Sequence, residues 1–226
     1  MHYPKTESLF SVDDQYLVGS DLLVKPVTAP GVVETAVKFP TDDRWYDAET
    51  LLLVSDSGTP GGYKEITVPS DIDTIPVFQR GGSIIARKLR LRRSTHMMFK
   101  DPYTLYIALD SSMKANGSIY MDDEETFDHE KKAEYAIATF TADFSGKTAQ
   151  IKHVVELGDG WAGHVDALTD AYIIERVIVM GVQEAPNSVD IGSTTLGFTY
   201  DSNAKVLVIR KPNISAIADW EMVVKP

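Results

Sequence analysis

Cysteine is absent from this chain of 226 residues. Disulfide bridges, thiolate metal sites and a cysteine nucleophile are therefore excluded, while the compartment stays open because a secreted domain can fold without bridges. The chain also lacks an apolar run of about 18 residues, so no transmembrane helix is predicted. Residues 1–5 lead into no apolar segment of the signal-peptide kind, and residues 223–226 are not a retention signal.

Positive charge is scarce. The 22 Lys and Arg residues are outnumbered by 33 Asp and Glu, which gives a net charge of −11 and a pI near 4.8. This balance disfavours nucleic-acid binding and suits a protein that handles neutral ligands. Hydrophobic residues make up 43% of the chain, and its 15 Gly and 11 Pro are typical of a turn-rich β protein of one large or two small domains.

Two common catalytic patterns are missing. No G-x-S-x-G segment is present, so no sequence motif supports a serine hydrolase. The histidines show neither H-x-x-x-H nor H-E-x-x-H spacing, and we predict no metal site and no cofactor from them; they are His2, His96, His129, His153 and His164.

Short strands dominate the pattern from Leu22 onward. The segments are rich in β-branched and aromatic residues and bounded by Gly, Pro, Asn or Asp, which favours β-sandwiches. The expected strands are Ser83–Ala86, Tyr63–Pro69, Thr104–Leu109, Ser118–Met121, Ala138–Phe144, Gln150–Leu157, Tyr172–Gly181, Lys205–Lys211 and Trp220–Lys225. A short helix is expected over Asp13–Leu23, with an aspartate N-cap and Gly19 as its end.

Three motifs have both functional and structural interpretations. Residues 158–163 match G-x-G-x-x-G, but no βαβ unit surrounds them, so a hairpin loop is favoured over a nucleotide site. The acidic stretch Asp122–Glu125, with Asp128, predicts a solvated loop, a cation site or an acid/base pair. The basic run Arg87–Arg93 predicts either a strand packed by its leucines or ion pairing with an acidic neighbouring domain.

Two further features concern sugars. The N-x-S/T sequences at Asn116 and Asn213 are possible N-glycosylation sites. Aromatic residues could also bind a sugar directly, although such side chains more often pack in cores. The candidates are Trp45, Tyr46, Trp161 and Trp220.

One segment carries a family resemblance: Pro76-Val77-Phe78-Gln79-Arg80-Gly81-Gly82-Ser83-Ile84-Ile85. Pro76 favours an extended entry, and the two glycines permit a tight turn or a close backbone approach. The segment resembles one found in glycoside hydrolase family 31, the α-glucosidases. Further resemblances follow in family order: residues 14–27, Trp45-Tyr46-Asp47 and residues 120–127. In the last of these Glu124 stands where the family has glycine, which puts a turn with positive φ in doubt there.

The resemblance implies a mainly β fold: the end of a (β/α)8 barrel over residues 1–25, then two antiparallel β-sandwich domains over 26–98 and 99–226. The family uses two aspartates in a retaining mechanism, and their surrounding motifs are absent here, so no catalytic residue is assigned. The chain is expected to be a C-terminal portion, inactive alone, that supports the barrel in a complex with the catalytic portion.

The closest similarity within the family is to an N-glycan-processing enzyme. It implies removal of α-1,3-linked glucose from glucosylated N-glycans in the lumen of the endoplasmic reticulum, with no membrane or nucleic-acid partner. It also implies retention there through a mannose-binding β subunit. The alternatives are a carbohydrate-binding β-sandwich module and the same portion of a maltose- or starch-type α-glucosidase.

Overall fold

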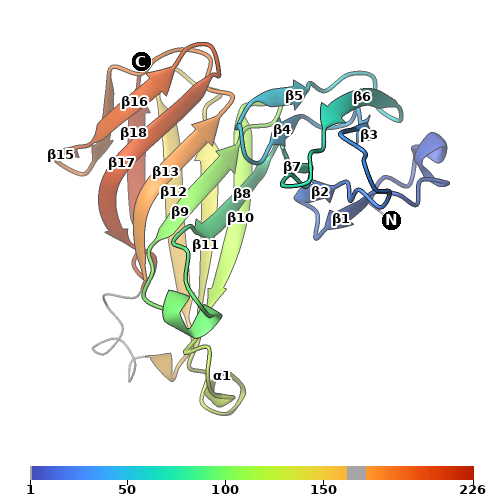
Figure 1. The fold of residues 1–226 in the computed structure, drawn as a ribbon. Coiled ribbons are helices and arrows are strands. Elements are labelled where there is room, and N and C mark those ends of the chain that lie inside the picture. Colours follow the sequence, from blue (N-terminus) through green and yellow to red (C-terminus); the bar gives the residue numbers. More distant parts are fainter. Residues whose placement is uncertain (1, 162–171) are drawn as a thin grey trace.

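The computed structural model describes residues 2–161 and 172–226, and it is mainly β, as predicted (Figure 1). The helical elements that lie wholly within this part are the 3-10 turns η1 (Glu7–Leu9) and η2 (Thr95–Met98) and the single-turn helix α1 (Asp128–Lys131). None of these, in the part of the chain described, is long enough to cross a bilayer.

Seven strands form the smaller unit. A five-stranded sheet runs in the order β1-β2-β7-β4-β5, and β3 pairs with β6 as a separate ribbon. Leu23 and Phe78 from the sheet bury against Val37 and Phe39 from the ribbon, so the two layers share one core with Trp45. The strands are β1 (Tyr16–Val18), β2 (Leu22–Val24), β3 (Glu34–Pro40), β4 (Trp45–Asp47), β5 (Leu53–Ser55), β6 (Tyr63–Pro69) and β7 (Val77–Arg80).

Eleven strands form the larger sheet, in the order β15-β14-β18-β12-β11-β10-β8-β9-β13-β17-β16. Only Leu196 separates β15 from β16 along the chain, so the two ends of the sheet come together and it nearly closes around its core. The strands are β8 (Ser83–Lys88), β9 (Tyr103–Ala108), β10 (Lys114–Met121), β11 (Ala136–Asp143), β12 (Ala149–Leu157), β13 (Ile173–Met180), β14 (Ser188–Ile191), β15 (Thr194–Thr195), β16 (Gly197–Asp201), β17 (Val206–Ser215) and β18 (Trp220–Lys225).

The period-2 pattern sets which face of each strand is buried. In β11 the side chains of Ala136, Ala138 and Phe140 are buried, and the residues between them are not. The strand β9 is buried at every position because both of its faces are covered: Leu105 and Ile107 pack in the main core of the larger sheet, and Tyr106 and Ala108 pack in a separate core with Tyr46. The predicted strands are confirmed, with β6 and β18 beginning and ending at the expected residues.

The helix predicted over Asp13–Leu23 is wrong. This segment forms the antiparallel hairpin β1–β2, in which Val18 pairs with Leu22. Gly19 has φ +61°, a conformation that suits the turn of a hairpin and breaks a helix. Because β2 also pairs with β7, residues 16–24 are built into the smaller unit of this chain, and the expected barrel end over residues 1–25 is not confirmed.

The larger sheet is mixed, whereas purely antiparallel sheets were expected. The strands β9 and β13 run parallel over six pairs, from Ile174↔Tyr103 to Met180↔Ala108, and β8 and β10 meet in a parallel bridge. The hydrogen-bonded sheets change between β7 and β8, at Gly81-Gly82, while the domain boundary near residue 98 remains a prediction.

The bridge between β8 and β10 depends on Gly117. A Cβ at this position would lie 2.1 Å from the carbonyl oxygen of Ile84, a contact that backbone atoms cannot relieve locally. Gly197 in β16 is different, because a Cβ there would meet nothing within 4 Å.

We predict that Gly117→Ala lowers the free energy of unfolding by about 2 kcal/mol or more, since the added methyl group forces β8 and β10 apart. The matched variant Gly197→Ala should change it by less than about 1 kcal/mol. Urea unfolding followed by circular dichroism measures both. Equal stability of the two variants would show that β8 and β10 need no close approach.

Candidate functional site

The segment 76–85 carries the chain from the smaller sheet into the larger one. Gln79, in β7 where the crossing begins, is buried. Its amide Nε2 donates to the Ser83 carbonyl oxygen (3.3 Å), the Ser83 hydroxyl (3.0 Å) and the Tyr106 carbonyl oxygen (3.0 Å). Arg80 faces the other way: its Nε donates to the Ser20 carbonyl oxygen at 2.7 Å, and its guanidinium pairs with Asp21 at 3.3 Å. One pair of neighbouring side chains therefore ties the crossing to both units.

The two glycines confirm the sequence interpretation of this segment. A Cβ on Gly81 would lie 2.9 Å from Arg44 Cβ and 3.1 Å from the Leu109 carbonyl oxygen, so the backbone makes a close approach there. Gly82 has φ +90°, which glycine adopts without strain. The Gly82 amide donates to the Ala108 carbonyl oxygen at 2.7 Å, and this bond starts the β8–β9 pairing.

Tyr46 supplies a second tie between the units. Its hydroxyl donates to the Leu109 carbonyl oxygen at 2.8 Å, and burial raises its pKa to about 12. The ring packs in a separate core with Tyr106, Ile178 and Met180 of the larger sheet. A Cβ on Gly181 would lie 2.4 Å from the Tyr46 oxygen, so this residue must be glycine for the ring to fit.

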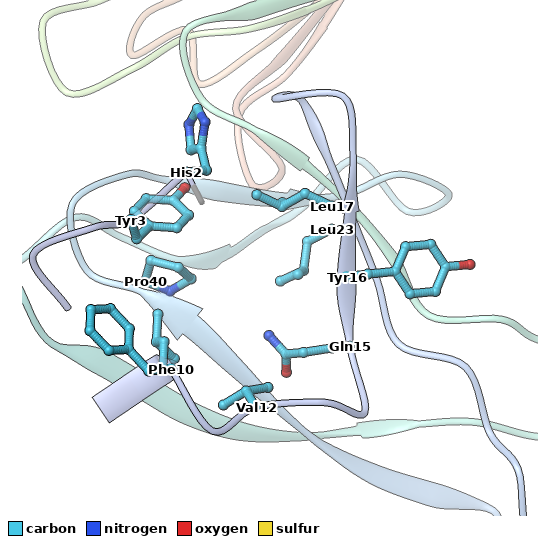
Figure 2. A pocket seen from close by; sticks show the side chains of 10 residues that line it. His2, Tyr3, Phe10, Val12, Gln15, Tyr16, Leu17, Leu23 and Pro40 are labelled. Carbon is cyan, nitrogen blue, oxygen red and sulfur yellow. The ribbon is translucent and has the colours of Figure 1, made fainter. Parts of the chain in front are cut away.

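A cavity of about 250 Å³ opens on the smaller unit beside the N-terminal segment (Figure 2). Its walls are mostly apolar, and all of the lining residues except Pro40 come from residues 2–23. The lining residues are His2, Tyr3, Leu9, Phe10, Val12, Gln15, Tyr16, Leu17, Leu23 and Pro40. Figure 2 shows Leu17 pointing from β1 toward Tyr3, whereas Tyr16 points outward.

Polar contacts hold the N-terminal segment in place around this cavity. The Tyr3 hydroxyl donates to Asp43 at 2.8 Å. The Gln15 amide pairs with the backbone of Lys38 in both directions, at 2.8 and 2.9 Å, as a strand neighbour would. Phe10 nevertheless remains 49% exposed and Tyr16 52% exposed. An apolar surface that is anchored yet uncovered is typical of a contact site for another polypeptide.

The acidic loop is organised by its own backbone. Asp123 Oδ1 accepts from the amides of Glu125 and Thr126, and Asp122 Oδ1 accepts from the amide of Glu124 at 2.9 Å. Glu124 has φ +58°, so the positive-φ turn forms despite the loss of the family's glycine, and the doubt raised from sequence is answered. Within the described residues, no group of three Asp, Glu or His side chains is placed to hold a metal ion.

The basic run pairs with Asp101, just before β9, and with Glu175 in β13, and the packed-strand interpretation is wrong. The strand β8 ends at Lys88, and Leu91 beyond it is 99% exposed. Arg92 forms a bidentate pair with the buried carboxylate of Asp101, at 2.9 and 2.7 Å, and Arg90 contacts Glu175 at 3.1 Å. These pairs hold the connection between β8 and β9 against the sheet.

The two described glycines of the G-x-G-x-x-G match, Gly158 and Gly160, allow close backbone packing against a neighbouring segment. A Cβ on Gly158 would lie 2.1 Å from the Ala133 carbonyl oxygen, and one on Gly160 would lie 1.9 Å from that of Lys132. Residues 162–171, which hold the rest of this motif and His164, lie outside the described residues.

Three of the four aromatic residues proposed for sugar binding are core residues. Trp45, Tyr46 and Trp161 are buried. Trp220 is partly buried and stacks on His153, with ring centroids 5.0 Å apart. The glycosylation candidates Asn116, in β10, and Asn213, in β17, are both exposed, and glycosylation of either remains a prediction.

His153 lies inside the larger sheet. Its Nδ1 is 2.9 Å from the Ala218 carbonyl oxygen, and burial lowers its pKa below the usual value near 6.5. In the folded chain this imidazole stays neutral at a pH where the unfolded chain already takes up a proton. Protonation therefore favours the unfolded state.

We predict that the unfolding midpoint of the chain falls as the pH is lowered below about 6.5, because only the unfolded state gains the His153 proton there. His153→Asn should flatten this dependence between about pH 6.5 and 5. The exposed His96→Asn serves as the control and should leave the slope unchanged. Thermal unfolding at a series of pH values provides the measurement; an unaltered slope in His153→Asn would rule out this source of pH dependence.

Comparison with known proteins covers the whole chain. Residues 1–85 match the glycosyl hydrolase family 31 C-terminal domain. Neutral alpha-glucosidase AB of Dictyostelium discoideum is 38% identical over 231 residues, which cover 100% of this chain and 22% of that protein. The chain belongs to glycoside hydrolase family 31. A probable glucan 1,3-alpha-glucosidase of Arabidopsis thaliana is 32% identical over 97% of this chain and 24% of its own length.

Solved structures agree with this family assignment. A glucosidase II alpha subunit with DNJ bound superposes with a TM-score of 0.79 at 27% identity, covering 97% of this chain and 24% of that one. The catalytic subunit in a heterodimeric ER glucosidase II complex with the binding domain of the regulatory subunit gives 0.73 at 27% identity, over 94% of this chain and 23% of that one. The chain thus spans about a quarter of the length of its family relatives.

The cavity is the feature that sequence reasoning missed. The family-like segment 14–27 supplies Gln15, Tyr16, Leu17 and Leu23, but Tyr3, Phe10 and Pro40 join them only when the N-terminal segment folds back on β3. The pair Leu9-Phe10, set between Ser8 and Ser11, was the signal in the sequence for an apolar surface here.

Proposed function

We propose that this chain is the non-catalytic C-terminal β portion of a retaining family 31 α-glucosidase, inactive alone, which supports a catalytic (β/α)8 barrel formed by residues outside 1–226. The observation that carries the proposal is the uncovered cavity around Phe10 and Tyr16, which is formed mostly by the segment 1–25 that would connect to the barrel. Residues 26–98 would form the proximal domain and 99–226 the distal one. Both catalytic aspartates would lie in the barrel.

The assembled enzyme would remove α-1,3-linked glucose from N-glycans in the lumen of the endoplasmic reticulum. Similarity to neutral alpha-glucosidase AB and to a probable glucan 1,3-alpha-glucosidase supports this linkage. The heterodimeric ER glucosidase II complex supports a second partner, the glucosidase II β subunit, which would retain the enzyme there. The glycan itself would contact the barrel.

The first experiment is denaturing mass spectrometry of the chain purified from its source, beside an assay with p-nitrophenyl α-glucoside. The expected result is a catalytic family 31 portion in the active sample, either in a second polypeptide or continuous with this one. A single 25 kDa species without activity would overturn the proposal. In the active sample, faster hydrolysis of maltose than of glucosylated high-mannose glycan would point to a maltose-type enzyme.

The exposed apolar surface around Phe10 is predicted to contact the catalytic portion. Phe10→Asp should weaken association with the catalytic portion about tenfold or more, because it places a charge in a desolvated apolar contact. The control Val154→Asp changes a side chain that is 59% exposed on β12 and should leave association intact. Co-purification with the catalytic portion at graded salt measures both. Equal retention of the two variants would place the contact elsewhere.

A further inference from the structure

A second group of aromatic side chains, two exposed and two partly buried, lies at the end of the larger sheet that carries α1; Figure 1 shows where this end lies. Tyr120, near the end of β10, stacks with Tyr135, with centroids 6.0 Å apart and ring planes 21° from parallel. His129 in α1 meets Tyr120 edge-on at 6.3 Å and lies 6.1 Å from Phe127. We call these four residues the Tyr120 patch.

The patch is exposed to water, unlike the aromatic residues buried in the cores. Tyr120 is 50% exposed and Phe127 is 68% exposed. Aromatic surface in contact with water carries a free-energy cost that a ligand can relieve. Binding would lose little conformational entropy in these rings, because the fold already holds them in place.

Strand register and loop contacts fix the rings. Tyr120 pairs with Ile137, so Tyr135, two residues earlier, lies diagonally opposite on the same face. The Tyr172 hydroxyl donates to the Asp122 carbonyl oxygen at 2.6 Å and anchors the loop after β10. A ligand would therefore meet a preorganised surface.

The surroundings of the patch identify the chemistry of the ligand. On this face of the β10–β11 hairpin the partly buried Ile137 lies opposite Tyr120, and exposed uncharged polar side chains follow beyond it: Asn116, Ser118, Thr139 and Thr141. Two carboxylates border the rings, with Asp122 3.7 Å and Glu130 3.9 Å from the imidazole nitrogens of His129. Flat rings beside hydroxyl, amide and carboxylate groups suit a neutral polyhydroxylated molecule, whose C–H faces stack and whose hydroxyls donate. The acidic chain disfavours phosphorylated ligands.

We infer that the Tyr120 patch binds a neutral oligosaccharide, an arm of the glycan held outside the catalytic portion. The assignment to a glycan arm rests on the proposed function. The binding chemistry rests on the patch alone, and its test therefore reads binding and not hydrolysis.

Saturation-transfer difference NMR on the 226-residue chain, with maltotriose and α-linked mannotriose each added alone, tests the inference. At least one sugar should bind with an affinity that falls about tenfold in Tyr120→Ala and in Phe127→Ala. Phe127 lies on the loop, so its variant keeps the test valid if Tyr120→Ala fails to fold. Tyr16→Ala is the matched control, because Tyr16 is 52% exposed but lies on β1, among apolar neighbours.

Absence of binding by the unmodified chain, or an equal loss in Tyr16→Ala, would overturn the inference. An active α-glucosidase sample whose chain binds neither sugar would remove this inference and leave the proposed function standing. Sugar binding that depends on Tyr120, in a sample without α-glucosidase activity, would support binding by the patch and remove the proposed function.

Discussion

The crossing at residues 79–83 is the constraint on which the rest of the structure depends. Gln79 is buried with its amide nitrogen bonded to Ser83 and to the Tyr106 carbonyl oxygen, while Gly81 brings the backbone against Arg44 and Leu109. Leaving the buried Gln79 amide without these partners would lower the free energy of unfolding by about 1–3 kcal/mol. These hydrogen bonds therefore fix the point at which the chain leaves one sheet, at β7, and enters the other, at β8. The two sheets therefore meet at one defined angle rather than through a free linker.

A fixed junction would allow this chain, to which no catalytic residue is assigned, to play the supporting role that we propose. The core around Tyr46, Tyr106 and Met180 fills the space between the units, and the Tyr46–Leu109 hydrogen bond spans it. The surface around Phe10 is then held at a set position relative to the larger sheet. A scaffold transmits position only if it resists bending, and close-packed interiors do resist it.

Local pattern was sufficient to predict most strands, and it failed where distant residues decide the outcome. The β11 and β12 strands alternate clearly between buried and exposed positions, so the buried face of each could be predicted.

Asp13–Leu23 has an aspartate and a glycine placed like the two ends of a helix. It forms a hairpin because β2 pairs with β7, some fifty residues away. The run after Lys88 looked like an amphipathic strand because the sequence does not reveal that Asp101 is buried and captures Arg92. Glu124 adopts positive φ because the Asp122 carboxylate accepts from its amide, a local bond that a count of glycines overlooks.

Exposure alone does not distinguish the two uncovered surfaces, since Tyr16 and Tyr120 are exposed to almost the same extent. Their neighbours differ. Tyr16 lines the same cavity as Phe10, Val12 and Leu17, where little polar surface is available to a hydrated ligand. Such a surface gains most from a partner that excludes water entirely. Tyr120 lies among hydroxyl, amide and carboxylate groups that stay hydrated until a ligand with matching hydroxyls replaces the water. The first surface therefore suits a protein and the second a sugar, and a substitution at one should leave the other's partner unaffected.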